Sequence, residues 1–401
     1  MRAPRRAHKG SRTRLLATTI VAAATLVVAA GCGGGGGAGA GSDSGDISIG
    51  FYAPESGFAA ADGKSAYDAA KLAVQHINSD GGIDGRNLKL VNYDDASDPK
   101  QAVTIATKLV RQDKVTAVVS GSYSDQTLAA APIFQRSSVP MIAAYAVNPG
   151  IPSTGDYIFQ QDGTGTVQGR AGAIALVDKL GAKKVAIVSI KNDFGEALVK
   201  GFSSQAVQLG AEVVATDYNQ FGEKDFSSII KRDLARGADA FYMVQYAAEG
   251  QQFIRAWNEL NVDLPLLGTE GIDTTTQFLE PVGKDADGMV FTTSLNRESD
   301  NPQTQKFIKD YSSAYGHAPD MVAATTYDSF FVMAHAMKTK GTDASQIKDG
   351  IAGTTNFDAV TGTIVKYNDL GQVVKAVELQ QIKDGKVVSF GQVSDPAVIT
   401  P

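Results

Sequence analysis

Short apolar runs alternate with longer amphipathic stretches along the chain from Ile47 onward. The first run, ISIGF, is followed by a stretch at 63–79 whose small and apolar residues recur at helical spacing on one face. These positions are Ala66, Ala70, Ala73 and Ile77. Gly81 and Gly82 follow closely and predict the end of the helix, because glycine readily adopts the left-handed conformation that closes many helices. The pattern therefore predicts a strand and then a helix.

The same alternation repeats further along the chain. After the run LKLVNY, Asp98 is a predicted N-cap and Pro99 a predicted first helical residue. One stripe of the helix that follows carries Ala102, Ile105, Ala106 and Leu109. Later apolar runs are TAVVSG, VPMIAAY, KVAIVSI, AEVVATDY, DAFYMVQY and DLPLLG. Strands this apolar, separated by helices, predict parallel sheets with both faces covered, so the expected fold class is α/β.

This fold class indicates where a ligand would bind, since open parallel sheets bind ligands beyond the carboxyl ends of their strands. Five segments are expected there: GSYSD at 121–125, AYAVNP at 144–149, KNDFGE at 191–196, QYAAEG at 245–250 and GTEGID at 268–273. They carry mostly hydroxyl, aromatic and carboxylate side chains.

The N-terminal residues have the layout of a secretory signal. Residues 1–31 contain six basic residues, all of them before Leu15, and no acidic residue. An apolar stretch begins at Leu15. That stretch is short for a membrane span. Residues 29–32, AAGC, resemble a bacterial lipobox, so Cys32 is predicted to be lipidated; the alternative is an ordinary signal peptide cut nearby, with a free Cys32. The Gly- and Ser-rich residues 32–46 are predicted to form a flexible tether, which we expect to lack order.

Charge and cysteine content narrow the partners further. Removal of residues 1–31 would change the formal net charge from −6 to −12, which excludes nucleic acid as an expected partner. Cys32 is the only cysteine, so the exported part must be held together by its apolar core. The remaining chain is long enough for two domains.

Motifs for nucleotide chemistry are absent from the sequence. The segment GFAAADGKS at 57–65 resembles a phosphate-binding loop but has five residues between its glycines where that loop has four. The segment GTGTVQG at 163–169 misses the dinucleotide-binding spacing by one residue. We therefore expect no nucleotide cofactor.

Metal and nucleophile motifs are equally weak. The histidines at 76, 317 and 335 are isolated and lack the HExxH arrangement. Asp94, Asp95 and Asp98 are close enough to attract calcium, although loop hydrogen bonding and helix capping are the favoured interpretation. No serine lies in a GxSxG elbow. The protein is therefore predicted not to be an enzyme and to hold no metal or cofactor.

Residues 56–110 carry a resemblance to a known family; they read SGFAAADGKSAYDAAKLAVQHINSDGGIDGRNLKLVNYDDASDPKQAVTIATKLV. This segment resembles the branched-chain amino-acid binding proteins of ABC transporters, which are type I periplasmic binding proteins. GEKDFSSII and GTEGI fit the same family, and the similarity covers residues 47 to about 395. The resemblance implies two doubly wound, Rossmann-like lobes joined by a three-segment hinge, with a solute between them. The expected lobes are 47–161 plus 295–379, and 162–294 plus 380–401.

The resemblance also implies which residues bind the ligand. A serine, a main-chain segment, a tyrosine and a glutamate hold the amino acid's carboxylate and ammonium in the family, and these fall on Ser124, Tyr145, Tyr246 and Glu270. Amides at a helix start beside Ser124 suit a carboxylate, and Glu270 can neutralise an ammonium.

Two positions depart from the family pattern. Val147 replaces a threonine and Phe194 replaces a tyrosine found in many members, so two hydroxyl contacts are lost. With Tyr123 as a further expected ligand contact, the pocket is more aromatic than leucine needs. Packing between the lobes is the alternative role for these aromatic residues, and helix capping is the alternative for Ser124.

Three functions follow from these observations. The first is a lipid-anchored solute-binding protein, on the outer face of the cytoplasmic membrane, that delivers a hydrophobic or branched-chain amino acid such as leucine to an ABC permease and its ATPase. The second is the same fold binding or sensing another solute, such as a short amide or an aromatic acid. The third is an extracytoplasmic enzyme, for which no catalytic constellation is found. In the first two, the lipid anchor is the only contact with the membrane.

Overall fold

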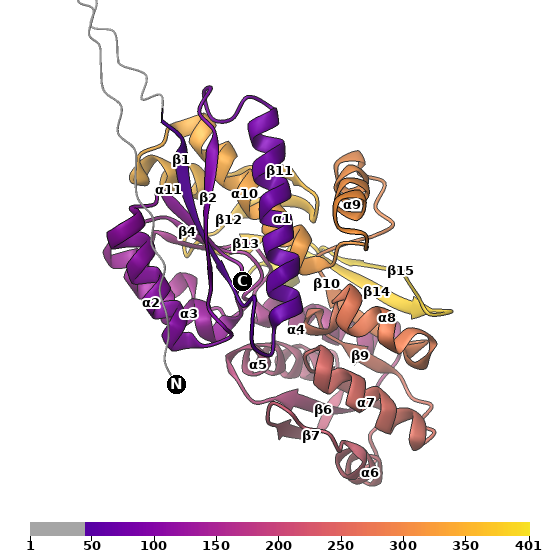
Figure 1. Cartoon of the computed structure of the whole chain (residues 1–401). Helices are drawn as coiled ribbons and strands as arrows, with labels where there is room; N and C mark the ends of the chain where they lie inside the picture. Colours follow the sequence, from indigo (N-terminus) through magenta and orange to yellow (C-terminus); the bar gives the residue numbers. More distant parts are fainter. Residues whose placement is uncertain (1–44) are drawn as a thin grey trace, which may run out of the picture. The chain divides into compact units, whose positions relative to one another are not determined.

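The computed structural model describes residues 45–401 of the chain. The predicted signal peptide, the predicted lipidation site Cys32 and most of the predicted tether therefore lie outside the described residues. The described part contains two large sheets and one small sheet, with helices packed against them (Figure 1). The α/β class predicted from the sequence is confirmed.

The first sheet has five parallel strands in the order β2-β1-β3-β4-β5. Its strands are β1 (Ile47–Ala53), β2 (Leu88–Asp94), β3 (Ala117–Ser120), β4 (Met141–Ala143) and β5 (Ile158–Gln160). The helices of this part are α1 (Ala60–Ser79), α2 (Pro99–Lys108), α3 (Ser124–Arg136), α9 (Pro302–Tyr315), α10 (Met321–Lys340) and α11 (Ala344–Ala352). Alternate residues of β1 enter different cores, since Phe51 packs in the cluster of α1 and α10 and Tyr52 in that of α2 and α3.

The second sheet has seven strands in the order β15-β14-β10-β9-β8-β6-β7. The parallel strands are β6 (Lys184–Ile190), β7 (Glu212–Asn219), β8 (Ala240–Val244), β9 (Leu266–Gly268) and β10 (Val290–Thr293). An antiparallel pair, β14 (Val377–Lys383) and β15 (Lys386–Val393), extends the sheet beyond β10. The helices of this part are α4 (Gly165–Ala173), α5 (Asp193–Gln208), α6 (Ser227–Ala235), α7 (Ala247–Glu259), α8 (Glu280–Val282) and α12 (Pro396–Ile399).

A small antiparallel sheet completes the described residues; its strands are β11 (Thr355–Ala359), β12 (Gly362–Tyr367) and β13 (Val373–Val374). A bridge between Gln160 and Gln372 joins it to the end of β5. The small sheet therefore belongs with the first large sheet.

Glycine permits the close crossing of α4 and α5 in the second part. A Cβ atom on Gly169 would lie 2.2 Å from the carbonyl oxygen of Leu198, and one on Gly201 would lie 2.2 Å from that of Thr166. Backbone cannot yield to such contacts as a side chain can, so only glycine fits there. These glycines set the distance between the two helices on one face of the sheet.

Local predictions for the first part agree with the structure. The helix expected over 63–79 extends over 60–79, and Gly81 and Gly82 follow it with φ of +90° and +67°. The carboxylate of Asp98 accepts a hydrogen bond from Lys100 N, so Asp98 caps α2 as expected.

The nearby aspartates take part in loop hydrogen bonds. Asp94 accepts bonds from Ser56 and from Ala96 N, and Asp95 accepts one from Ser97 N. Within residues 45–401 no group of three or more His, Cys, Asp or Glu side chains could hold a metal ion. Capping and loop bonding, rather than calcium binding, are the roles that the geometry supports for this cluster.

The chain passes three times between the parts built on the first and second sheets. It leaves the first after β5, returns after β10, and leaves again between the end of β13 and the start of β14. The third boundary was expected between residues 379 and 380, but both lie inside β14, where Glu378 and Leu379 already pair with β10. The crossing is therefore at 375–376, because backbone pairing with β10 and β15 begins at the first residues of β14.

A buried ion pair lies beside the second and third crossings. Arg297 follows β10, and its guanidinium contacts the carboxylate of Asp273 and, at 2.9 Å, the side-chain oxygen of Gln380 on β14. Asp273 has no exposed side-chain surface, and Thr293 donates a further hydrogen bond to it. The pair fixes the segments that cross between the two sheets.

Replacing Arg297 by methionine is expected to lower the free energy of unfolding by about 3 to 5 kcal/mol, because it leaves the Asp273 carboxylate buried without its cation. Urea denaturation followed by circular dichroism measures this change. The matched control is Arg232→Met, which removes an arginine paired with Asp217 at the surface and should change the midpoint little. Equal midpoints for the two variants would contradict a structural role of the Asp273 pair.

Candidate ligand-binding site

A cavity lies where the carboxyl ends of strands from both large sheets meet. Its lining residues are Asp62, Tyr123, Ser124, Tyr145, Phe194, Tyr246, Glu270, Gly271, Met321 and Val322. Six of the seven ligand contacts expected from the sequence are among them, and Val147 is not. The arrangement matches the rule that open parallel sheets bind ligands beyond the carboxyl ends of their strands.

The first sheet supplies a helix start to this cavity. Tyr123 and Ser124 follow β3, and Ser124 is the first residue of α3. Tyr123 occupies the N-cap position but makes no side-chain cap, so Ser124 is not a capping residue. The Ser124 hydroxyl accepts a bond of 3.3 Å from Asn148 N. The first amides of α3, like those of any helix, have no acceptor within the helix and so suit an anionic group.

The second sheet supplies the residues opposite. Phe194 follows β6 in the first turn of α5, Tyr246 follows β8 at the N-cap of α7, and Glu270 follows β9. Gly271 fits here because a Cβ atom on it would lie 2.7 Å from Gln245 O and 3.0 Å from the Phe194 ring. The chain beside Glu270 can therefore approach the aromatic residues closely.

Aromatic rings from both sheets stack across the cavity. Tyr123 and Tyr246 lie nearly parallel, with ring centroids 4.6 Å apart, and Phe194 stacks on Tyr246 at 4.8 Å. Tyr145 meets Tyr123 edge-on, and its hydroxyl donates to the carbonyl oxygen of Gly121. Such ring pairs stabilise a contact beyond the area that they bury, so they hold the two parts together.

Glu270 is a buried carboxylate with only part of its hydrogen-bonding capacity used. Its side chain is 2% exposed, and Gln168 donates to Oε2 at 2.5 Å. Among the described residues, none donates to Oε1. Burial and the negative charge of Asp162 hold the pKa of Glu270 well above its usual range. A cationic group placed beside Oε1 would relieve both effects.

Asp62 is a second buried carboxylate in the cavity and was not predicted from the sequence. It lies in the first turn of α1, is 3% exposed, and accepts a hydrogen bond from the Tyr123 hydroxyl on Oδ2. Burial and the negative charge of Asp320 raise the pKa of Asp62 to about 7, against the opposing effect of that hydrogen bond. The signal was present in the sequence, since Asp62 follows the first strand, whose carboxyl end was not among the five segments considered.

Met321 and Val322 were also missed. They begin α10 and line the cavity from a segment that the chain reaches only after its second crossing. Nothing in the local pattern separates these residues from the rest of a helix whose buried positions run through most of its length.

Val147 lies in the apolar core instead of at the cavity. Its side chain is fully buried and belongs to the same cluster as Val167 and Leu198, while its carbonyl oxygen accepts a bond of 2.7 Å from Gly165 N. An apolar β-branched side chain gains more from this packing than from facing polar groups. The loss of a hydroxyl at position 147 is thereby accommodated without exposing an apolar group to the cavity.

The space left between the side chains of the site is small, about 20 Å³. This is room for a single water molecule. The aromatic rings therefore fill the cavity in this arrangement, and an amino acid could enter only after the two parts or their rings move apart.

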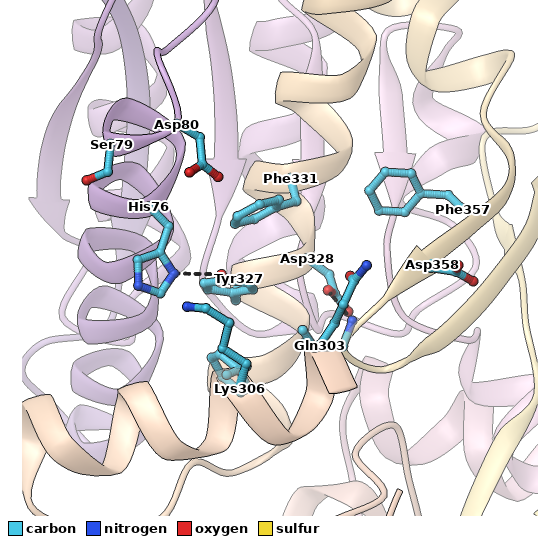
Figure 2. A pocket seen from close by; sticks show the side chains of 12 residues that line it. His76, Ser79, Asp80, Gln303, Lys306, Tyr327, Asp328, Phe331, Phe357 and Asp358 are labelled. Carbon is cyan, nitrogen blue, oxygen red and sulfur yellow. Dashed lines mark hydrogen bonds between the residues drawn. The ribbon is translucent and has the colours of Figure 1, made fainter. Parts of the chain in front are cut away.

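A larger cavity of about 530 Å³ lies between α1, α9, α10 and the region of β11 (Figure 2). None of the predicted site residues lines it. Its polar groups have partners: His76 Nδ1 lies 2.8 Å from the Tyr327 hydroxyl, and Asp328 accepts bonds from Val360 N and Thr361 N (Figure 2 shows the first of these). Among its described lining residues, no buried polar side chain lacks a hydrogen-bond partner. We therefore take the cavity between the sheets as the candidate site.

Comparison with known proteins agrees with this choice. The family model described as periplasmic binding protein matches residues 46–386. The chain belongs to the periplasmic binding protein family. An amino acid binding protein from Pseudomonas aeruginosa is 32% identical over 230 residues, which are 57% of this chain and 62% of that relative. The match thus spans less than two thirds of the length of this relative.

Solved structures resemble the whole described part. A branched-chain amino acid transporter substrate binding protein from Streptococcus pneumoniae, in complex with isoleucine, is 28% identical with a TM-score of 0.81, covering 87% of this chain and 99% of that one. A solute binding protein of an ABC transporter from R. palustris, in complex with benzoate, is 25% identical with a TM-score of 0.79, covering 88% and 99%.

These relatives confirm three predictions made from the sequence. The chain resembles branched-chain amino-acid binding proteins, and it has the type I periplasmic binding protein fold. Its relatives are named as binding proteins, which agrees with the prediction that it is not an enzyme.

Among residues 45–401, no helix combines the length and the apolar character needed to cross a membrane.

Proposed function

We propose that this periplasmic binding protein is the solute-binding component of an ABC importer and binds a hydrophobic or branched-chain α-amino acid. The observation that carries the proposal is the pairing of two opposite recognition groups at one cavity. The N-terminal amides of α3 come from the first sheet, and the Glu270 carboxylate comes from the second. An α-amino acid presents a carboxylate and an ammonium, which are the complementary groups.

The remaining lining residues suit an amino acid side chain. Phe194, Met321 and Val322 are apolar, and the rings of Tyr123 and Tyr246 present their faces to each other across the cavity. Apolar walls with a few convergent polar groups are typical of small-molecule sites. The walls would therefore bury an aliphatic side chain while the polar groups hold the backbone atoms of the ligand.

Binding in this proposal requires two lobes that open and close. The lobes are residues 47–161 plus 295–376 and residues 162–294 plus 377–401, which follows the strands of the two sheets and moves the third boundary from 379. Three chain segments cross between them, which allows a hinge motion without unfolding either sheet. The small volume of the cavity supports the motion, because the rings must separate before an amino acid can enter.

The second candidate is a different small solute, such as a short amide or an aromatic acid. The aromatic lining supports it, as does the relative from R. palustris that is bound to benzoate. Two buried carboxylates, Asp62 and Glu270, oppose an anionic acid because like charges repel strongly in a desolvated site. The electrostatics therefore favour a ligand with an ammonium group.

Glu270→Gln is expected to weaken an α-amino acid roughly tenfold to a hundredfold, because a hydrogen bond between charged groups contributes about 1.5 to 3 kcal/mol. Calorimetric titration with leucine, phenylalanine, a short amide and benzoate measures this. The same variant should change binding of the amide little and should favour benzoate by removing repulsion. A thermal-shift screen of the same compounds identifies which of them stabilise the wild type.

The matched control is Glu249→Gln. Glu249 is also buried, but it accepts a hydrogen bond from Gly222 N at 2.8 Å and does not line the site. Its replacement should leave amino acid affinity within about twofold, since it changes no group at the cavity. A wild-type protein that binds only the amide or benzoate would contradict the amino-acid proposal.

The N-terminal sequence supports an anchored location for the importer component. The AAGC motif before the glycine tract is the expected site at which Cys32 receives lipid, which would hold the folded part at the outer face of the cytoplasmic membrane beside its permease and ATPase. Binding proteins of importers act outside the cytoplasm, and a tether keeps the solute near the permease.

Cys32→Ala in the full precursor is expected to abolish lipid attachment and to shift the protein from the detergent phase to the aqueous phase in detergent partitioning. Ligand affinity of the purified soluble form should not change, since residue 32 belongs to the predicted tether and precedes residues 45–401, which contain the candidate site. Retention of the alanine variant in the detergent phase would exclude Cys32 as the anchor.

A further inference from the structure

Asp62 has an unused acceptor atom at the ligand cavity. Its Oδ2 accepts the hydrogen bond from Tyr123, whereas no donor among the described residues reaches Oδ1. The side chain is 3% exposed and lines the cavity. A buried carboxylate oxygen without a donor is costly, so an interaction with the ligand would stabilise the closed site.

The charged residues around the cavity are all acidic. Its ten lining residues include two carboxylates, Asp62 and Glu270, and no Lys, Arg or His. In the proposed function the α-ammonium of the ligand is used by Glu270 and the α-carboxylate by the start of α3. The α-ammonium has three N–H donors, and Glu270 needs one of them for its free Oε1, so a donor for Asp62 comes either from that ammonium or from the side chain of the ligand. Asp62 lies on α1, which packs against α10, and Met321 and Val322 at the start of α10 belong to the apolar wall proposed for that side chain. This position favours the side chain of the ligand as the donor.

The neighbouring Asp320 is a carboxylate whose hydrogen bonds come from other groups of the protein. Its Oδ1 accepts hydrogen bonds from Ser65 at 2.7 Å and from Ala323 N at 2.9 Å, so its contacts are made within the protein. Asp62 differs because its Oδ1 is buried and receives no hydrogen bond from a described residue, whereas neither oxygen of Asp320 is in that state. Holding the Tyr123 ring in place accounts for Oδ2 alone.

We propose that Asp62 is a specificity-determining residue that accepts a hydrogen bond from the side chain of the bound amino acid. The protein then selects amino acids whose side chain carries a hydroxyl or ammonium donor over aliphatic side chains of the same shape. Threonine is the branched member of this class. The inference rests on the proposed binding of an α-amino acid and replaces the purely aliphatic side chain of that proposal by one of similar shape that carries a donor.

Two matched pairs of ligands test it, because each pair differs only by a donor group in place of a methyl group. These are threonine with valine, and ornithine with norleucine. Calorimetric titration at pH 8 should show that the wild type binds the donor member of at least one pair roughly tenfold to a hundredfold more tightly. Asp62→Leu should remove or reverse this preference, because the acceptor is replaced by an apolar group of similar size.

Tyr123→Phe distinguishes ligand contact from a purely structural role. If Asp62 only positions the Tyr123 ring, both variants should change the ratio of affinities within each pair alike. In our proposal Tyr123→Phe keeps that ratio, whatever it does to the affinities themselves, because the acceptor is still present. If Asp62→Leu does not fold, Asp62→Asn is the second variant. It is expected to reduce the preference for the donor member of each pair, because it removes the charge of Asp62 and retains its shape.

Two further outcomes separate this inference from the proposed function. If the wild type binds the methyl member of both pairs as well as or better than the donor member, or binds leucine and none of these four, the role of Asp62 is wrong and amino-acid binding stands. If no α-amino acid binds, leucine included, the proposed function itself fails, and the inference with it.

Discussion

The constraint on which the site depends is the burial of two carboxylates in one cavity whose described lining residues include no Lys, Arg or His. Asp62 and Glu270 are almost fully buried, and each retains one oxygen that no donor among the described residues reaches. Burial raises the pKa of both groups, which shows that the closed form without a ligand disfavours their charge. In the proposed hinge motion, opening would return both groups to water. A ligand that supplies donors therefore stabilises closure, which couples binding to lobe motion through simple desolvation.

The fold brings these groups together because residues that follow parallel strands line the cavity from both large sheets. In each sheet the helices or turns that follow parallel strands start at the carboxyl edge, and the two edges meet at the cavity. Asp62 and Ser124 reach it from the first turns of α1 and α3, while Glu270 reaches it from a short 3₁₀ turn after β9. Helix starts also bring unpaired amides, so the same architecture supplies both the anion-binding and the cation-binding parts of the site.

The sequence predicted the fold from local patterns, and six of the ten residues that line the candidate cavity from those patterns together with the family resemblance. Apolar runs at regular intervals indicate parallel strands, and residues directly after them lie at one edge, which is how Tyr246 and Glu270 could be placed. Met321 could not be found in this way, since it begins a helix that the chain reaches after a crossing. The side of the loop that Val147 faces depends on packing with distant residues, and the start of β14 depends on pairing with β10.

The side chain of Tyr123 contacts both the buried carboxylate of Asp62 and the stacked ring of Tyr246. Its hydroxyl is bound to Asp62 within the first part, and its face is stacked on Tyr246 of the second. A change in what Asp62 binds would therefore act on the contact that joins the two lobes. A ligand donor would bind Oδ1 while Tyr123 still donates to Oδ2, so the stacked ring stays in place. An apolar group beside Oδ1 would leave that oxygen without a donor in a desolvated site. Selectivity and closure are thus both expected to depend on the carboxylate of Asp62, through its two different oxygens.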